Sequence, residues 1–282
     1  TFNYRYAPIA TTVREQLIQG KIGRPLHINC QWVLDTFHGA DYFRRWHGKI
    51  AKGGSLWVHK ATHHFDLLNW WLNSEPVEVT AYGSLEHYGK NNAFRGTKCR
   101  GCEHKDNCKF YWDITGNKHN VNMYVNNEKY DGYLRDGCVW SNDIDIYDKM
   151  SAQIIYANGV QVNYSLTTYS PYEGWQIAFN GLKGRIETWE DIPYLQKTPE
   201  DQAKRHAIEM SNADDAIPGE IREIIAMDNF AKNYEVYTTP KIRGGHGGGD
   251  IRMQTRMFVD KNDNPHHIMA GTREGAMSIL IG

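Results

Sequence analysis

Residues 53–73 read GGSLWVHKATHHFDLLNWWLN and combine a pair of glycines with the periodicity of a helix. Phe65, Leu68 and Leu72 recur at i, i+3 and i+7, which is the spacing of one helical face. An apolar stripe of this kind packs a helix against a core. The stretch therefore predicts a glycine turn followed by a helix that docks on the rest of the fold.

A second face of the predicted helix is polar and rich in histidine. His59, His63 and Asp66 stand at i, i+4 and i+7, and Lys60 and His64 lie one position round from them. Imidazole titrates near neutral pH and a carboxylate can hold its second nitrogen, so this face suits proton transfer. Histidines four residues apart also ligate zinc in H-E-x-x-H, but the glutamate of that motif is absent. We favour proton transfer and predict that the catalytic residues are His63, His59, Lys60 and Asp66.

The segment before this helix predicts a strand that leads into a polar loop. Residues 25–35, PLHINCQWVLD, alternate between apolar and polar side chains, as in a half-buried strand. Residues 35–47, DTFHGADYFRRWH, follow as a loop with many polar and aromatic groups, and such loops beside a rigid sheet often carry function. We expect its arginines to hold a carboxylate or sugar hydroxyls, and its aromatic rings to stack on the ligand. The substrate-binding candidates from this loop are His38, Tyr42, Arg44 and Arg45.

A second candidate loop is rich in glycine. Five glycines bracket His246 in the segment KIRGGHGGGDIRMQTRMF, and Asp250 follows as a good helix cap. The glycine register does not match G-x-G-x-x-G, and no GK[ST] sequence is present, which argues against phosphate binding. We interpret the segment as a flexible loop that carries His246 to a ligand. His246 and His64 complete the substrate-binding candidates.

The remaining pattern predicts an antiparallel sheet. Residues 76–84 favour a strand, and Asn158-Gly159 predicts the turn of a hairpin between apolar alternating segments. Residues 174–189 predict two more strands about a turn at 180–184. Residues 197–220 indicate a charged loop or short helix, and 220–227 a further strand or helix. The fold class predicted is α+β: an open, mostly antiparallel sheet with helices packed chiefly on one face.

Residues about 90–145 interrupt this pattern with a polar, aromatic segment of weak periodicity, which we interpret as an insertion on the sheet. It contains four cysteines, spaced C-x2-C-x5-C with the fourth thirty residues on. Four thiolates would form a tetrahedral zinc site or hold a metal cluster, while disulfides or free thiols are the alternatives. An insertion so poor in apolar periodicity needs a staple, so we favour structural zinc. The predicted metal ligands are Cys99, Cys102, Cys108 and Cys138.

Composition excludes several classes of protein. The chain has 282 residues, 40% of them hydrophobic, and a formal net charge of -1, so neither nucleic acid nor an anionic membrane is expected as a partner. No run of 18 apolar residues and no signal peptide is present. We therefore expect a cytoplasmic protein. Residue 1 is threonine rather than methionine, so a segment is expected before it. A signal peptide in that segment would give a periplasmic location, which stays open as the alternative.

The central stretch resembles the signature of the Gfo/Idh/MocA oxidoreductases, GG-x4-D-x3-H-x2-D. Gly53 and Gly54 match the glycines, His63 matches the catalytic histidine, and Asp66 matches the last aspartate. His59 occupies the position of the first aspartate, a departure that puts simple alcohol dehydrogenation in doubt while keeping a pair of proton-handling groups. The segments NYRY, GRIE and HGGGD also resemble the family.

The resemblance implies the substrate and catalytic half of an enzyme dependent on NAD or NADP. In the family an N-terminal nucleotide-binding domain precedes this half, and no strand–GxGxxG–helix unit occurs in this sequence. We expect residues 1–282 to form a single substrate domain, similar to the C-terminal domain of glyceraldehyde-3-phosphate dehydrogenase and inactive alone. Asn3 and Arg5 of NYRY are candidates for the cofactor boundary, although a structural arginine at a domain junction is the alternative for Arg5.

The implied reaction is hydride transfer from a sugar, glycoside or cyclitol, with His63 as the acid or base. Two alternatives stay open. One is an NAD-dependent glycosidase or lyase that oxidises its sugar transiently. The other is a non-catalytic sugar-binding or dimerisation module, which an excess of apolar side chains on the outer face of the sheet would favour. We also expect a homo-oligomer that pairs through the open sheet face.

Overall fold

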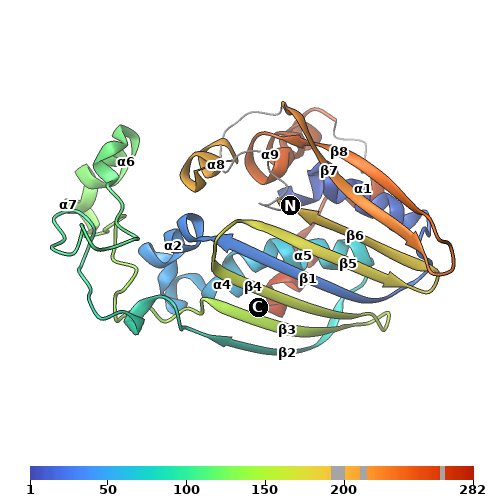
Figure 1. Ribbon diagram of the computed structural model, residues 1–282, viewed down its shortest axis with the longest axis horizontal. Helices are drawn as coiled ribbons and strands as arrows, with labels where there is room; N and C mark the ends of the chain where they lie inside the picture. The colour runs from blue at the N-terminus through green and yellow to red at the C-terminus, as the bar shows by residue number, and fades with distance from the viewer. Residues whose placement is uncertain (192–200, 210–214, 261–263) are drawn as a thin grey trace.

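An open mixed sheet forms the centre of the computed structural model (Figure 1). The structure describes residues 1–191, 201–209, 215–260 and 264–282, and within these ranges eight strands pair in the order β2-β3-β4-β1-β5-β6-β7-β8. Only β1 and β4 pair in parallel among the described strands. The predicted fold class is therefore confirmed. The strands are β1 (Pro25–Asp35), β2 (Pro76–Ser84), β3 (Lys149–Tyr156), β4 (Gln161–Ser170), β5 (Gly174–Gly181), β6 (Gly184–Glu190), β7 (Ala216–Asp228) and β8 (Tyr234–Ile242).

The strand predictions from alternation and turn chemistry hold closely. β3 and β4 form the hairpin expected about Asn158-Gly159, and Gly159 has the positive φ of 83° that the turn requires. β5 and β6 form the second predicted hairpin. Residues 220–227, predicted as strand or helix, lie in β7. The predicted charged segment at 197–220 is described only in part, because 192–200 and 210–214 lie outside the described residues.

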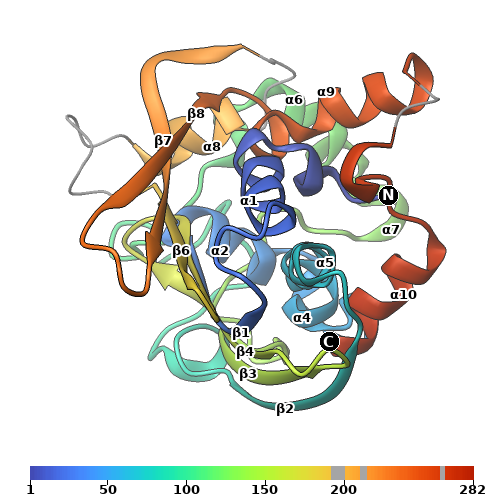
Figure 2. The ribbon, with the colours of Figure 1, turned by 90° about the vertical axis from the view of Figure 1, so that its right-hand side faces the viewer.

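Helices cover one face of the sheet (Figure 2). Those that lie against this face are α1 (Pro8–Ile18), α4 (Ser55–His59), α5 (Ala61–Leu72) and α10 (Thr272–Ile281). Phe65 and Leu68, two members of the predicted apolar stripe, have no exposed surface, and Leu72 is buried as well. The stripe packs on the inner side chains of the strands: the ring centroid of Phe65 lies 4.8 Å from that of Tyr164 on β4.

The central helix differs from the prediction because it is broken at Lys60. The Lys60 amide donates to the Leu56 carbonyl and closes α4, and the His63 amide then donates to the Lys60 carbonyl, three residues back. This tightened junction changes the direction of the chain before α5 begins. The side chains on either side of Lys60 therefore do not continue on one straight face.

The expected loop at 35–47 contains a helix, α2 (Thr36–Arg44). Its first turn forms because the Asp35 carboxylate, at the end of β1, accepts hydrogen bonds from the backbone amides of Phe37 and His38. Gly39 lets α2 approach β4 closely, since a Cβ at this position would lie 1.8 Å from the Thr168 carbonyl oxygen. Strand β1 thus delivers a helix, not a loop, to the end of the sheet.

The other described α-helices are α3 (Ile50–Gly53), α6 (Lys118–Met123), α7 (Glu128–Asp131), α8 (Gln202–Glu209) and α9 (Gly245–Phe258). Of these helices, α6 and α7 lie beyond α2, and α9 lies beside β7 and β8 (Figure 1). The 3-10 turns are η1 (Asn3–Tyr6), η2 (Trp46–Gly48), η3 (Gly89–Asn91), η4 (Ile114–Gly116), η5 (Val125–Asn127) and η7 (Pro265–His267). No helix in the described ranges is long and apolar enough to cross a membrane.

Candidate active site

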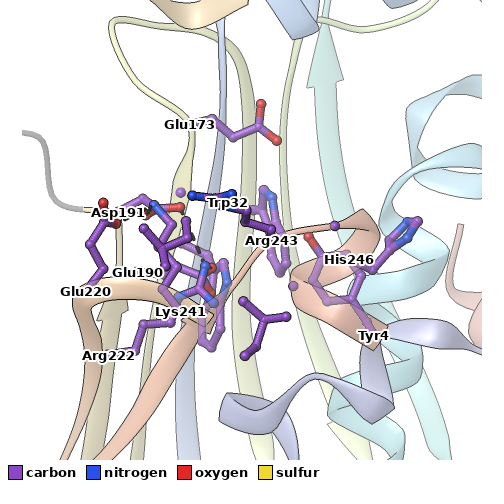
Figure 3. Close-up of a pocket in the computed structure, with 16 residues that line it drawn as sticks. Tyr4, Trp32, Glu173, Glu190, Asp191, Glu220, Arg222, Lys241, Arg243 and His246 are labelled. Carbon is purple, nitrogen blue, oxygen red and sulfur yellow. Dashed lines mark hydrogen bonds and ion pairs between the residues drawn. The ribbon is translucent and has the colours of Figure 1, made fainter. Parts of the chain in front are cut away.

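A cavity of about 170 Å³ lies where η1, the start of α9 and the ends of several strands meet (Figure 3). Aromatic side chains form part of its wall: Tyr4 from η1, Trp32 from β1 and Trp175 from β5. Trp32 and Trp175 stack with their ring centroids 5.6 Å apart, which gives the cavity a flat apolar surface. A wall of this kind suits the apolar face of a ring-shaped ligand.

His63 lies next to two of the residues that line this cavity. Its imidazole lies 5.2 Å from that of His246 and 6.0 Å from the Tyr4 ring, measured between centroids. Nδ1 of His63 is buried and has no hydrogen-bond partner, and His63 itself stands behind the residues that line the cavity. Two predicted site residues, His63 and His246, are therefore brought together although 183 positions separate them in the sequence.

The environment of His63 favours the neutral imidazole. Burial, together with the positive fields of His246 and Lys60, lowers the pKa of His63 to about 3, and the Asp250 carboxylate opposes this only in part. Desolvation penalises the charged form of a histidine, which is why burial acts in this direction. At neutral pH His63 is consequently a proton acceptor.

His246 is fixed by two polar neighbours. Its Nδ1 lies 3.1 Å from both carboxylate oxygens of Asp250, and the Asn3 amide donates to Asp250 Oδ1 over 2.6 Å. A carboxylate only accepts, so Nδ1 of His246 donates to Asp250, and the Asn3 Nδ2 that lies 2.9 Å from this Nδ1 donates to Asp250 as well. His246 has a φ of 56°, in the left-handed region, and Gly247 and Gly248 continue in that conformation. The glycine-rich segment is thus a kinked helix start, and Asp250 pairs with a side chain instead of capping the helix.

Charged residues from the last strands close the opposite side of the cavity (Figure 3). Arg222 on β7 pairs with Glu190 on β6, and Lys241 on β8 pairs with Asp191 at 2.9 Å. Burial raises the pKa of Glu190, while the Arg222 guanidinium counteracts it. Sequence reasoning missed these residues. The available signal was their strand phase, because Arg222 shares the inward phase of Ile224 on β7.

A second missed carboxylate connects the cavity to α2. Glu173 lines the cavity, and Nδ1 of His38 donates to its Oε2 over 2.8 Å. Burial alone would raise the pKa of Glu173, but His38 and Lys60 lower it instead. Lys60 is itself buried, and within the described part of the chain no carboxylate lies within ion-pair distance of its ammonium group. The His38 candidate thus reaches the cavity through Glu173.

His59 and His47 form a hydrogen-bonded pair of imidazoles. Their Nε2 atoms are 2.8 Å apart, so one nitrogen donates its hydrogen to the other. Burial lowers the pKa of both, that of His47 to about 3. The ring of Tyr42, a predicted binding residue, meets both imidazoles edge-on with centroid distances of 5.6 and 5.8 Å. His59, which occupies the position of the first aspartate of the signature, therefore has a partner in His47 that the sequence did not suggest.

Two members of the predicted polar face point elsewhere. Asp66 accepts two hydrogen bonds from the Arg5 guanidinium, at 2.6 and 2.7 Å, in a fully buried ion pair. The expectation that Asp66 orients an imidazole is thus corrected: its partner is Arg5. His64 is also buried, stacked on Trp32 at 3.6 Å with Nδ1 near the Tyr164 hydroxyl. The predicted polar face is therefore divided, because the helix is interrupted at Lys60 and because Asp66 and His64 bond to residues outside that face.

The two arginines of α2 make contacts within the protein. Nη1 of Arg44 donates to the Cys99 sulfur over 3.1 Å, and Nη2 donates to the Phe110 carbonyl oxygen. Arg45 pairs with Asp41 one turn earlier and lies over the Tyr42 ring. Both arginines therefore help to hold α2 and the insertion in place around the candidate site.

The predicted zinc site is not supported. The four cysteines line one small cavity of about 20 Å³ and are free thiols, but no three His, Cys, Asp or Glu side chains in the described residues are placed to hold a metal ion. Two of the sulfurs instead accept hydrogen bonds, Cys99 from Arg44 and Cys138 from the Gly96 amide. Ion pairs supply the expected staple, with Arg100 bonded to Asp136 at 2.8 Å and also to Glu128.

Comparison with known proteins identifies a protein family and a related protein. A family model described as the oxidoreductase family, C-terminal alpha/beta domain (Gfo/Idh/MocA) matches residues 14–281. A Bacillus subtilis (strain 168) protein named "Putative oxidoreductase YteT" is 35% identical over 295 aligned positions. That alignment covers all of this chain but 64% of the relative, so the chain spans less than two thirds of that protein's length.

Solved structures share the fold. A levoglucosan dehydrogenase in complex with NADH and levoglucosan has a TM-score of 0.56 and 16% identity, with 99% of this chain and 60% of the other covered. An aldose-aldose oxidoreductase from Caulobacter crescentus, complexed with glycerol, has a TM-score of 0.54 and 11% identity, with 100% and 58% covered. At these identities the similarity concerns the fold alone.

Proposed function

The chain belongs to the Gfo/Idh/MocA oxidoreductase family, and from this premise we propose that it binds the substrate and handles the proton in an oxidoreductase dependent on NAD or NADP. The substrate we propose is a sugar, glycoside or cyclitol. The observation that carries the proposal is a neutral imidazole, His63, beside a cavity walled by aromatic rings and carboxylates. This set of groups matches a ligand with hydroxyl edges and apolar ring faces.

Substrate recognition would divide between the two walls of the cavity. Carboxylates such as Glu173 and Asp191 accept hydrogen bonds, and sugar hydroxyls donate them. Trp32 and Tyr4 supply flat surfaces for the C–H faces of the ring. The cations among the described lining residues all have a carboxylate partner, so this lining does not demand an anionic ligand. The pairs are Arg222 with Glu190, Lys241 with Asp191 and Arg243 with Asp215.

The proton step would belong to His63. Oxidation of a carbinol to a carbonyl breaks the C–H bond as hydride and the O–H bond as proton, and the lone pair of the His63 imidazole takes that proton. The Asp250 carboxylate, held beside His246, is the neighbouring charge that favours the imidazolium formed on His63. We propose Lys60 and the His47–His59 pair as groups that tune or relay the proton, since the field of Lys60 already acts on His63.

The cofactor would supply a hydride acceptor when bound. The sequence holds no strand–GxGxxG–helix unit for the pyrophosphate. The two residues predicted at the cofactor boundary are engaged internally, Asn3 with Asp250 and Arg5 with Asp66. The chain's own residues thus do not fit a whole dinucleotide, and we propose that a separate nucleotide-binding domain holds most of it.

The test uses this chain fused to a nucleotide-binding domain of the family and a panel of sugars and cyclitols. We expect reduction of NAD or NADP with at least one of them, and His63→Asn should lower turnover by about 10²–10⁴-fold, the usual worth of a general base. The substrate affinity should change far less. His119→Asn, an exposed histidine, is the matched control. Near-normal turnover of His63→Asn would move the base elsewhere, with Lys60 next. Calorimetry on the unfused chain should show weak or no dinucleotide binding.

One observation favours a second candidate reaction. The His47–His59 pair places two further proton-handling groups near the site, where the family signature has a single aspartate. A glycosidase or lyase that oxidises its sugar transiently needs an additional acid or base for elimination. Product analysis separates the two: net reduced nicotinamide accumulates only in the dehydrogenase.

We also propose a homo-oligomer that pairs through the open sheet face. A shallow hollow of about 830 Å³ lies on this face and is lined mainly by amides, hydroxyls and small residues. Amide side chains donate and accept equally, so such a face can pair with a copy of itself. The lining of this hollow has no excess of apolar side chains, which is the feature that would favour a module that only dimerises. Members of this polar row are Asn29, Gln31, Gln153, Asn163, Ser165 and Gln176.

A further inference from the structure

A second, larger cavity lies on the other side of α2 from the candidate active site. It has a volume of about 520 Å³ and is enclosed by α2, α8 and the insertion, which Figure 1 shows beside α2 on the side away from α9. Phe37, Phe110 and Trp112 give it aromatic walls, and Asp41 and Asn120 add polar groups. Its size is in the usual range for small-molecule sites.

The walls of this cavity are rigidly held. Trp112 lies under the guanidinium of Arg135 at 4.9 Å, and Arg135 pairs with Asp41 on α2 at 2.6 Å. On the other side, Gln202 of α8 accepts a hydrogen bond from Thr36 at the start of α2 over 2.9 Å. The insertion and α8 are therefore both anchored to the same short helix.

Buried polar atoms without partners occur on side chains around the cavity. Nε2 of His87, Nη1 of Arg135 and Nδ1 of His206 are all buried and make no hydrogen bond. These three atoms have almost no accessible surface, so they do not face the cavity directly. The polar side chains among the lining residues that suit a hydroxylated ligand are those of Asp41, Asn120 and Gln202.

A thin rim separates the two cavities. Glu173 lines the first, His206 lines the second, and His38 lies between them. His38 bonds to Glu173 at 2.8 Å, and its ring centroid is 4.4 Å from that of His206. Three side chains in contact therefore form the partition between two neighbouring cavities, which together are named the cleft.

We propose that the second cavity is a binding subsite for a second sugar ring, so that the substrate is a glycoside of at least two rings. This inference rests on the proposed function, because the first ring would occupy the cavity beside His63. The second ring would contact the part of Trp112 left open beside the Arg135 guanidinium at 4.9 Å and the Arg44 guanidinium at 5.9 Å. It would hydrogen-bond to Asp41 and Asn120. The insertion would then serve to build this subsite, with Trp112 as a specificity-determining residue.

Calorimetry on the chain tests the subsite with a panel of disaccharides (cellobiose, lactose, maltose, melibiose and rutinose) and their component monosaccharides. We expect at least one disaccharide to bind about tenfold or more tightly than either component. Trp112→Ala should remove that gain and leave monosaccharide affinity unchanged, while Trp112→Phe should retain most of it. Tyr130→Ala, an aromatic side chain 76% exposed on the same insertion and absent from the cavity lining, should behave as wild type.

Three outcomes would overturn the subsite: equal affinity for disaccharides and monosaccharides, equal weakening of both by Trp112→Ala, or no disaccharide binding. The fused protein separates this failure from that of the proposed function. If it oxidises monosaccharides as efficiently as every disaccharide, the subsite is wrong and the function stands. If a disaccharide binds with the Trp112 dependence but no nicotinamide is reduced, the function is wrong and the subsite stands.

Discussion

At the scale of single residues, burial controls the histidines around the cleft more than charge pairing does. Burial is the first cause lowering the pKa of His47 and His63 to about 3 and of His206 to about 4. Transfer from water penalises an imidazolium more than a neutral ring, so each of these groups stays uncharged at neutral pH. The cleft therefore contains several neutral histidines that can accept a proton. Their lowered pKa values arise only in the folded protein.

These lowered pKa values predict a loss of stability in acid. An unfolded histidine binds a proton near pH 6.5, whereas the folded ones resist it until about pH 3 to 4. The unfolded state thus binds more protons across this window, and the free energy of unfolding falls as the pH falls from 7 to 4. Asp66 opposes this, because burial raises its pKa to about 6 despite Arg5, but the histidines outnumber it.

Urea unfolding at several pH values measures the effect. His47→Gln should reduce the loss of stability between pH 7 and 4 by about 1–3 kcal/mol, because one depressed titration is removed. The exposed His119→Gln should leave the pH dependence unchanged. A stability profile that is flat from pH 7 to 4, or identical in the two variants, would contradict this account.

Sequence reasoning at this scale found residues with a local signal. His63 and His246 could be identified because each lies in an unusual segment, a polar helix face or a run of glycines. Arg222 and Glu190 were missed: the strand phase of Arg222 marks only its inward direction, and its pairing with Glu190 depends on which strands become neighbours. Asp66 was assigned the wrong partner for the same reason: Arg5 lies 61 positions away.

At the scale of elements, prediction succeeded where periodicity and turn chemistry act locally. The strands β1 to β6 and the apolar face of α5 follow from alternation, helical spacing and Asn158-Gly159. Helix α2 was interpreted as a loop because its sequence is polar and aromatic without a clear stripe. Its helical state depends on the Asp35 cap and on packing against β4, and the second of these is tertiary.

The close approach of α2 to β4 predicts a sharp effect at Gly39. A Cβ there would lie 1.8 Å from the Thr168 carbonyl oxygen, so Gly39→Ala must displace the helix or the strand. We expect a loss of about 1–3 kcal/mol or more in the free energy of unfolding. Because α2 also lines the second cavity, disaccharide affinity should fall as well.

Gly116→Ala is the matched control for this change. It lies in the insertion, where an added methyl group would meet nothing within 4 Å, and its φ is not positive. Denaturant unfolding of both variants checks the prediction. A Gly39→Ala protein as stable as Gly116→Ala would mean that α2 does not pack on β4 as described.

At the scale of the whole molecule, the open sheet face predicts association between copies. Ser165 on β4 lies in the middle of this face, between Gln31 on β1 and Ser151 on β3. Ser165→Arg would place two like charges at the centre of a self-paired interface, which destabilises it. Sedimentation of the wild-type chain should give a dimer or larger species, and the variant a monomer with unchanged unfolding. A monomeric wild type would exclude this interface.

The parallel pairing of β1 with β4 has a consequence for how the chain acquires its fold. β1 is complete at residue 35, yet both of its neighbours, β4 and β5, lie in residues 161–181. During synthesis β1 must therefore wait for more than a hundred further residues before its first strand neighbour, β4, begins. Pairings of such sequence separation are slow to form and leave hydrophobic surface exposed meanwhile. The order of synthesis thus leaves β1, the first strand made, unpaired until the β3–β4 hairpin and then β5 have followed.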